Sequence, residues 1–245
     1  MNMPQRHRYL IFVFFWIILL MVPFFPHPGQ AQTWSSQAVD APRMFDKPSS
    51  RSIAVDAAGR PHIVFGQDHL YHAHYDGLTW QIVTVDAASQ VGEHASIAIR
   101  AGNEIHVSYY DKLNGDLKYA TNRYGAWRTS TVDSAGDVGQ YTCIALGTQG
   151  STVKVHISYY DATNQTIQYK SKAIDDNWPA NSERVATIGN IGQNRAIAMA
   201  VDPAGHPHIG YYDAATRELK YSNRVSGSWM PAPTPIDSSA NVGLY

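Results

Sequence analysis

The chain of 245 residues is poor in cysteine and in charge, with one cysteine and 16% charged side chains. The single cysteine, Cys143, can form neither an internal disulfide bond, nor a four-cysteine zinc site, nor a CxxC redox pair. Positive and negative groups nearly balance, at 19 Lys and Arg against 20 Asp and Glu. No basic surface therefore suggests a nucleic acid as the partner.

The sequence also lacks helical periodicity, since no stretch after residue 31 keeps a period of about 3.6 over ten residues. It is rich instead in tyrosine, glycine and proline, with 15, 18 and 13 of each. Together with the low charge, this composition is typical of many short strands joined by tight turns. We therefore expect an all-β fold.

The long apolar run lies at the N-terminus. Arg6 and Arg8 precede an uncharged run over residues 9–25, and a small-x-small cleavage pattern follows at residues 29–31. This order is typical of a secretory signal peptide, which we place at residues 1–31. We expect the mature chain to be secreted or to lie on the exterior of the cell envelope, without a membrane span. An uncleaved N-terminal anchor is the alternative.

Four markers return together with a period of about 48 residues. They are a tryptophan, a histidine, a Val-Gly or Ile-Gly pair, and the triplet Tyr-Tyr-Asp. The tryptophans are Trp34, Trp80, Trp127, Trp178 and Trp229, the histidines are His62, His106, His156 and His208, and the triplets occupy 109–111, 159–161 and 211–213. A period of 40–50 residues built of short strands indicates the blades of a β-propeller.

One repeat unit predicts four strands. They cover residues 96–99, 105–110, 117–120 and 127–132. Gly59, Asn103 and Gly205 stand where the hairpin between the first two strands of a unit needs a positive φ. Each blade is therefore expected to be a four-stranded antiparallel sheet.

The phase of the repeat predicts four complete blades. Residues 34–40 have the Trp-to-Asp spacing of residues 80–86, so we expect a lone closing strand ahead of the first blade. Residues 242–245 match the start of one more blade. We therefore expect residues 32–245 to form one propeller domain that is truncated at its C-terminal end. An open array of four blades with a spare N-terminal strand is the alternative.

The link into the last strand of a unit contains Gly-x-Trp, at 125–127 and 227–229, and Gly-x-Thr-Trp at 77–80. These units resemble the repeats of bacterial sialidase-type propellers, also called bacterial neuraminidase or Asp-box repeats. The resemblance spans residues 34–245 and implies the propeller fold. The motif is degenerate, with Tyr75 at the aspartate position of the box, and the chain contains no Arg-Ile-Pro motif. The resemblance therefore assigns no catalytic residue.

The Tyr-Tyr-Asp triplets carry the binding hypothesis. Each ends the second strand of its unit, and we expect the loop that follows to open on the same face of the propeller as the crossover between blades, where residues 139–141 lie. Aromatic rings beside carboxylates are a common means of holding sugars. The predicted ligand-binding residues are Tyr110, Asp111, Tyr160, Asp161, Tyr212 and Asp213.

The other repeated residues receive structural interpretations. We expect the four histidines to bond neighbouring backbone or turn groups rather than a metal, and the tryptophans to pack between sheets. Asp56, Asp86, Asp133 and Asp202 end strands and are expected to cap turns. Cys143 is expected to be a small buried residue. We accordingly assign no metal, cofactor or catalytic residue.

Three functions remain open. The leading hypothesis is an exported propeller that binds extracellular glycans or another cell-surface ligand at several equivalent sites on one face. The second is a sialidase-like glycoside hydrolase, which would need a pair of carboxylates or the family's tyrosine in one cleft. The third is a propeller scaffold for protein contacts. The sequence favours a binding protein over an enzyme.

Overall fold

The computed structural model describes residues 51–192 and 197–239. The chain divides into two compact units, Met1–Gln37 and Ala38–Tyr245, and all described residues belong to the second. The predicted signal peptide, the lone strand at 34–40 and the extra repeat start at 242–245 lie outside the described residues. In the described part of the chain, no helix is long and apolar enough to cross a membrane.

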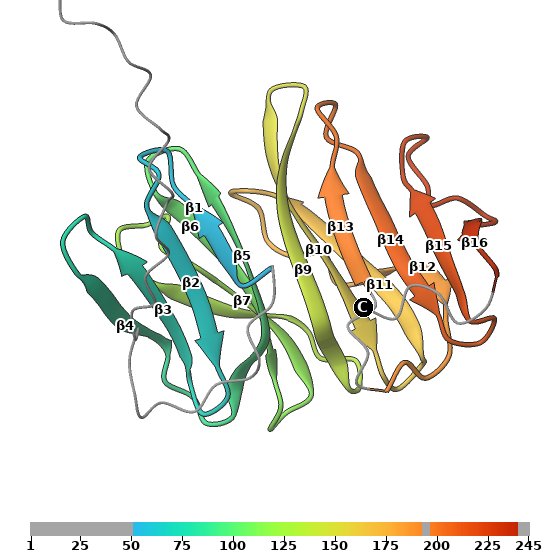
Figure 1. The fold of residues 1–245 in the computed structure, drawn as a ribbon, viewed down its shortest axis with the longest axis horizontal. Coiled ribbons are helices and arrows are strands. Elements are labelled where there is room, and N and C mark those ends of the chain that lie inside the picture. The colour runs from blue at the N-terminus through green and yellow to red at the C-terminus, as the bar shows by residue number, and fades with distance from the viewer. Residues whose placement is uncertain (1–50, 193–196, 240–245) are drawn as a thin grey trace, which may run out of the picture. The chain divides into compact units, whose positions relative to one another are not determined.

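The described residues form sixteen strands in four antiparallel sheets of four (Figure 1). Each sheet takes its strands in chain order, so every blade is a meander of three hairpins. Blade 1 contains β1 (Ile53–Val55), β2 (Pro61–Gly66), β3 (Leu70–Tyr75) and β4 (Trp80–Asp86), and blade 2 contains β5 (Val91–Arg100), β6 (Glu104–Asp111), β7 (Asp116–Thr121) and β8 (Arg128–Asp133). Blade 3 contains β9 (Val138–Gln149), β10 (Thr152–Asp161), β11 (Thr166–Ala173) and β12 (Glu183–Thr187), and blade 4 contains β13 (Ile197–Val201), β14 (Pro207–Asp213), β15 (Glu218–Asn223) and β16 (Thr234–Asp237).

The first strands of successive blades lie side by side. β1 contacts β5, β5 contacts β9, and β9 contacts β13. Arg51 reaches across this group, because its Nη1 donates to the carbonyl oxygens of Tyr141 in blade 3 and Ile197 at the start of blade 4, at 3.0 and 2.8 Å. The sequence prediction of an all-β chain with four-stranded blades is confirmed.

The strands of blade 2 match their predicted ranges except at the first one. The Val-Gly pair was expected in the crossover between blades, but β5 begins at Val91 and β9 at Val138. That expectation is wrong because Gly92 and His94, at φ 102° and 57°, form an irregular stretch that still pairs with β6. Pairing therefore continues through the crossover, as a bulge, instead of stopping before it.

The hairpin prediction is confirmed at all three positions. Gly59, Asn103 and Gly205 have φ of 78°, 58° and 84°. Asp202 also caps its turn as predicted, because its Oδ1 accepts from the backbone nitrogens of Ala204 and His206 at 2.9 and 2.8 Å. Residue type alone therefore sets the path of these turns.

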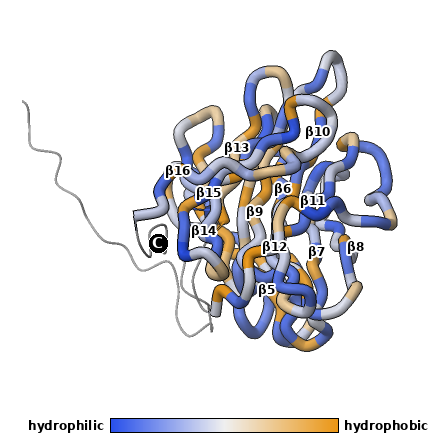
Figure 2. Tube along the Cα trace, turned by 90° about the vertical axis from the view of Figure 1, so that its right-hand side faces the viewer, coloured by the Kyte–Doolittle hydropathy of each residue, from blue (hydrophilic) through white to orange (hydrophobic). Residues whose placement is uncertain are grey.

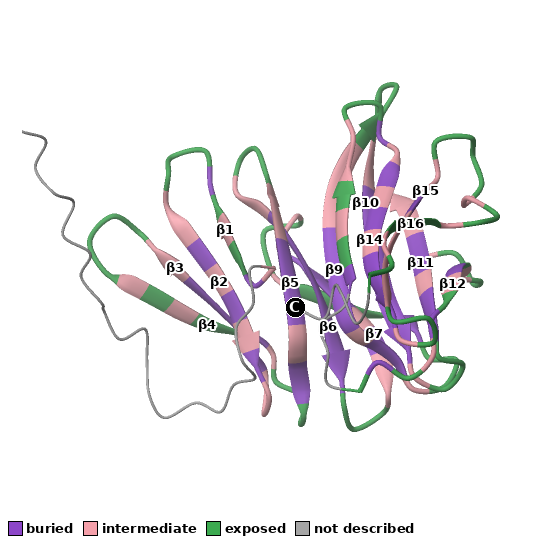
Figure 3. Ribbon diagram, turned by 45° about the vertical axis from the view of Figure 1, so that its right-hand side comes forward, coloured by how far each residue is buried: buried purple, intermediate pink, exposed green. Residues whose placement is uncertain are grey.

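The hydrophobic core lies between blades rather than within one sheet. Val64 and Leu70 of blade 1 pack with Ile97 and Val107 of blade 2, and the next two junctions are built in the same way. Figure 2 shows apolar residues along the strands and hydrophilic residues in the loops, and Figure 3 shows the burial along β5, β6 and β9. Each blade therefore depends on its neighbours to cover its apolar face.

Tryptophans occupy the predicted place between sheets. Trp127 packs edge-on against His72 with ring centroids 5.5 Å apart, and Trp178 packs in the same way against Tyr119 at 5.3 Å. Trp229 does so against Tyr169 at 5.1 Å. Each of these three tryptophans therefore contacts the third strand of the preceding blade, whereas Trp80 packs against Tyr75 of its own blade at 5.8 Å. Figure 1 shows the blades in this order along the chain.

The repeat histidines bond side chains rather than backbone, and the expected bond to a turn group is present at His208, whose Nε2 lies 3.3 Å from Oδ2 of Asp202. Nδ1 of His106 is 2.5 Å from the hydroxyl of Tyr119, and Nδ1 of His156 is 2.6 Å from that of Tyr169. The tyrosine lies on the neighbouring strand, so the pair pins two strands of one blade together. Burial lowers the pKa of both histidines to about 4.

The buried histidines predict a stability that falls in mild acid. Their folded pKa of about 4 lies below the ordinary value of 6.5, so the unfolded chain takes up protons first as the pH drops. Between pH 7 and pH 5 each of His106 and His156 should lower the free energy of unfolding by about 2 kcal/mol. Urea unfolding followed by tryptophan fluorescence at both pH values measures this loss. The double variant His106→Gln, His156→Gln should show a flatter pH dependence, and an unchanged slope would contradict the assignment.

The lone cysteine is buried as predicted. Cys143 is 5% exposed, and its Sγ lies 3.9 Å from the carbonyl oxygen of Met199 in the next blade. Burial raises the pKa of the thiol above its ordinary value. Cys143 therefore acts as a small packing residue at the junction of blades 3 and 4.

Candidate functional site

The junction between blades 1 and 2 is tied by an aspartate at the end of the last strand. Oδ2 of Asp86 accepts from the hydroxyl of Tyr109 at 2.6 Å and from Nζ of Lys118 at 2.7 Å. Its Oδ1 caps the following turn by accepting from the nitrogen of Ala88 at 3.0 Å. Burial opposes ionisation of Asp86, but the bonds from Lys118 and Tyr109 outweigh it and hold the pKa below its ordinary value. The aspartate therefore remains charged between its two partners.

The junction between blades 2 and 3 repeats this arrangement. Asp133 accepts a short hydrogen bond from the hydroxyl of Tyr159, and Nζ of Lys170 lies 3.6 Å from the same carboxylate. Burial, followed by the bond to Asp133, raises the pKa of Tyr159 far above its ordinary value. Tyr109 and Tyr159 are the first tyrosines of the first two Tyr-Tyr-Asp triplets, so in these two triplets the first ring bonds the preceding blade.

The junction between blades 3 and 4 lacks the aspartate. Asp86 pairs with Leu70 and Asp133 pairs with Leu117, whereas the same register position of blade 3, opposite Ile167, is Ala186. The expected tyrosine is still there, since Tyr211 is 2% exposed. No hydrogen-bond partner of its hydroxyl is found among the described residues.

The lysine of this junction binds elsewhere. Nζ of Lys220, on the strand next to Tyr211, donates to Oδ2 of Asp213 at 2.7 Å and lies 3.0 Å from Oε2 of Glu218. Burial lowers the pKa of Lys220, but the ion pairs with Asp213 and Glu218 outweigh it, so the pKa lies above the ordinary value. Lys220 is therefore a charged ammonium group at the junction that lacks the aspartate.

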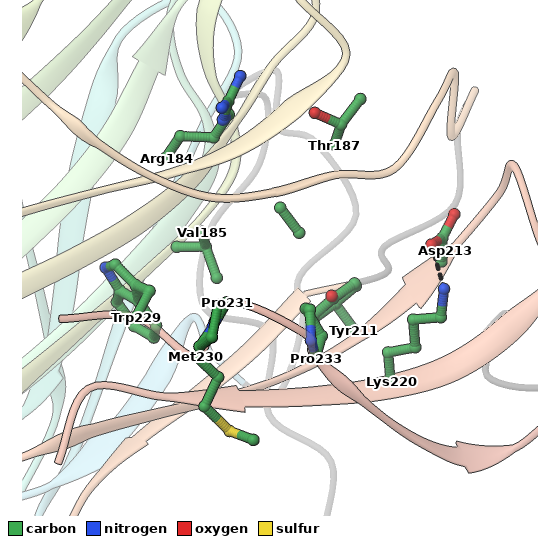
Figure 4. A pocket seen from close by; sticks show the side chains of 11 residues that line it. Arg184, Val185, Thr187, Tyr211, Asp213, Lys220, Trp229, Met230, Pro231 and Pro233 are labelled. Carbon is green, nitrogen blue, oxygen red and sulfur yellow. Dashed lines mark hydrogen bonds and ion pairs between the residues drawn. The ribbon is translucent and has the colours of Figure 1, made fainter. Parts of the chain in front are cut away.

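A pocket of about 470 Å³ opens at this junction (Figure 4). Its apolar wall is formed by Val185, Ala186, Trp229, Met230, Pro231 and Pro233. Its polar groups belong to Arg184, Thr187, Tyr211, Asp213 and Lys220. Ligand pockets combine apolar walls with a few placed polar groups in just this size range, about 300 to 1,000 Å³.

Of the six predicted ligand-binding residues, the structure places one in the lining of the pocket. Tyr110, Asp111, Tyr160, Asp161, Tyr212 and Asp213 are all buried. Asp111 accepts from the backbone nitrogen and from Nδ2 of Asn114 at 3.1 and 2.9 Å, and Asp161 is bonded in the same way by Asn164. These two aspartates cap the loop between the second and third strands. Asp213 is the predicted site residue that lines the pocket.

The second tyrosine of the first two triplets bonds the crossover to the next blade. The hydroxyl of Tyr110 donates to Oδ1 of Asp137 at 2.7 Å, and that of Tyr160 donates to the carbonyl oxygen of Gly189 at 2.9 Å. The loops and crossovers therefore meet, as the sequence predicted. Ligand binding by Tyr110, Asp111, Tyr160, Asp161 and Tyr212 remains a prediction.

Four rings of this region form a row. His94 lies 6.0 Å from Tyr110 and 4.4 Å from Tyr141, which is 6.4 Å from Tyr160. His94 and Tyr141 both have positive φ, at 57° and 53°. Left-handed backbone of this kind at non-glycine residues persists only where packing enforces it. The row brings two of the predicted tyrosines together with rings from the neighbouring strands.

Arg184, Lys220 and Trp229 line the pocket but were not among the predicted site residues. A signal was present, because blades 1 and 2 end in Thr-Val-Asp, at 84–86 and 131–133, whereas blade 3 has Arg-Val-Ala at 184–186, one residue before the end of β12. The missing carboxylate at the third junction marks the place where the pocket forms.

The chain has no match among protein-family models, and a search of curated proteins finds none either. Its fold is similar to that of a variant of the Aleuria aurantia lectin in complex with Fucα1-6GlcNAc, at 17% identity and a TM-score of 0.52. That match covers 78% of this chain and 64% of the lectin, so the chain spans slightly less than two thirds of the lectin's length.

Two further similar structures are carbohydrate-active enzymes. The catalytic domain of the Coprinopsis cinerea GH62 α-L-arabinofuranosidase matches at 12% identity over 78% of this chain and 71% of that chain, with a TM-score of 0.46. An exo-β-1,3-galactanase from Phanerochaete chrysosporium matches at 14% identity over 78% and 54%, with a TM-score of 0.44. The four sheets of four antiparallel strands and the similarity to the Aleuria aurantia lectin confirm the predicted β-propeller fold.

Proposed function

We propose that this chain is an exported β-propeller binding module and that it holds an extracellular glycan in the pocket between blades 3 and 4. The observation that carries the proposal is the pocket itself, which stands where the other two junctions are closed by a carboxylate. Export rests on the sequence pattern at residues 1–31. The fold shared with a fucose-binding lectin supports a carbohydrate-related role.

The lining has the chemistry that sugars require. Trp229 and the prolines Pro231 and Pro233 offer an apolar surface for the C–H face of a sugar ring. The hydroxyls of Tyr211 and Thr187 and the ammonium of Lys220 can bond ring hydroxyl groups. Polar groups fixed among apolar walls give orientation as well as affinity.

Binding fits this pocket better than glycoside cleavage. Hydrolysis through paired carboxylates needs two such groups about 5 to 10 Å apart that flank the scissile bond. Asp213 is the one carboxylate among the described residues that line the pocket, and it is engaged by Lys220. The sialidase-like hydrolase and the protein scaffold remain the alternatives to our proposal.

A glycan array followed by calorimetry on the full chain tests the function. We expect at least one glycan to bind, and Thr187→Trp, a bulky change at an exposed position of the lining, to weaken that binding at least tenfold. Ser134→Trp is the matched control, because Ser134 is the exposed residue after Asp133 at the junction of blades 2 and 3. Folded protein that binds no glycan would overturn the proposal, and equal weakening by both variants would overturn the location of the site.

A further inference from the structure

Two of the three described blade junctions share the same set of interacting side chains, and the third lacks one member of that set. At two of them a carboxylate from the last strand of one blade accepts the hydroxyl of a buried tyrosine in the next blade and lies beside a lysine ammonium. At the third junction the tyrosine and the lysine are kept, as Tyr211 and Lys220, and the carboxylate is replaced by the methyl group of Ala186. The pocket therefore keeps the tyrosine and the lysine that surround the junction aspartate elsewhere, without that aspartate.

The hydroxyl of Tyr211 and the ammonium of Lys220 can each still donate a hydrogen bond to an anion. The hydroxyl of Tyr211 has no hydrogen-bond partner among the described residues, and its side chain is almost fully buried against the pocket. An ammonium group has three N–H donors, and two of those of Lys220 are directed to Asp213 and Glu218. One donor of Lys220 therefore remains for a ligand that enters the pocket.

A further positive charge stands at the pocket. Arg184, two residues before Ala186, lines the pocket and is exposed, and it makes no ion pair with any residue in the described ranges 51–192 and 197–239. A guanidinium group presents a planar fork of donors that matches a carboxylate. Figure 4 shows Arg184 on the side of the pocket opposite Lys220.

We propose that the glycan held between blades 3 and 4 carries a carboxylate, and that this group takes the position of the absent aspartate between the hydroxyl of Tyr211 and the ammonium of Lys220. The ligand is thus an acidic sugar, either a hexuronate or a nonulosonate such as N-acetylneuraminate. The sugar ring occupies the rest of the cavity, against Trp229 and Pro231. This inference rests on the proposed function.

Calorimetry with matched monosaccharides tests the charge of the ligand. The probes are the methyl glycosides of glucuronate, galacturonate and N-acetylneuraminate, with methyl glucoside and the methyl ester of the glucuronate as neutral counterparts. We expect at least one acidic probe to bind tenfold or more tightly than its neutral counterpart, and the three acids to identify the source of the carboxylate. Neutral sugars that bind as well as the acids would overturn the inference and leave the proposed function intact. A chain that binds no sugar would overturn both.

Two variants locate the carboxylate. Ala186→Asp restores the closing group of the other junctions, so it should raise the unfolding temperature and weaken binding of the acidic sugar at least tenfold. Ala186→Asn has nearly the same volume without the charge and should not raise the unfolding temperature. Tyr211→Phe removes the hydroxyl that makes no bond to described residues, so it should fold normally and still weaken acidic-sugar binding about tenfold. Unchanged affinity in both Ala186→Asp and Tyr211→Phe would place the ligand elsewhere.

Discussion

Replacing Asp86 by alanine should lower the free energy of unfolding by about 3 kcal/mol. The substitution breaks a largely buried charge pair and leaves two buried donors without an acceptor. Nζ of Lys118 and the hydroxyl of Tyr109 would both lose their acceptor, at 2.7 and 2.6 Å, and the cap of the next turn would be lost too. The side chains of Lys118 and Asp86 are 14% and 10% exposed, so water cannot replace the aspartate completely. Urea unfolding of the full chain, with equal denaturant dependence for both proteins, measures the loss.

The control for this prediction is Asp175→Ala. Asp175 also pairs with a cation, Arg123, but its side chain is 66% exposed. An exposed pair contributes about 0 to 1 kcal/mol, so this variant should be close to the unchanged protein. If both substitutions lower the free energy of unfolding by the same small amount, the bonds from Asp86 to Tyr109 and Lys118 do not stabilise the contact between the blades.

Gly139→Ala should lower the free energy of unfolding by about 3 to 5 kcal/mol or prevent folding, because it combines a steric clash with backbone strain. A Cβ atom at residue 139 would lie 2.7 Å from Cα of Leu117 and 2.9 Å from its Cβ. Leu117 is fully buried in the preceding blade and cannot withdraw. The φ of +103° is unfavourable for alanine as well. Thermal unfolding and the yield of soluble protein report the result.

Gly125→Ala separates the two causes. Its φ is +83°, but a Cβ there would have no atom within 4 Å. It should therefore show only the backbone cost, about 1 kcal/mol. A similar loss in Gly125→Ala and Gly139→Ala would mean that the close approach of β9 to Leu117 is unimportant.

The period of the sequence was sufficient to predict the blades. A tryptophan and a histidine mark the same places in all four units and Tyr-Tyr-Asp does so in three of them. Turn residues such as Gly59 and Asn103 have little conformational choice. Local chemistry therefore determines most of the fold within one blade.

Contacts between blades were harder to predict. The sequence shows that Tyr109 recurs, but not that its hydroxyl bonds Asp86 of the blade before it. The replacement of the junction aspartate by Ala186 is difficult to recognise in the sequence, because the spacing of the repeat changes there. Ala186 follows Trp178 by eight positions, whereas Asp86 follows Trp80 by six. A pocket made by the loss of one side chain becomes visible only when the three junctions are compared in register.

The two tyrosines of the first two triplets also bear on how the chain can assemble. Tyr109 and Tyr159 bond backward and Tyr110 and Tyr160 bond forward, over separations of 23 to 29 residues. Such short loops cost little closure entropy and keep the contact order of these ties low for a β protein, which favours rapid folding. These ties join blades that are adjacent in the chain, so each blade can dock onto its neighbour without waiting for distant parts of the sequence.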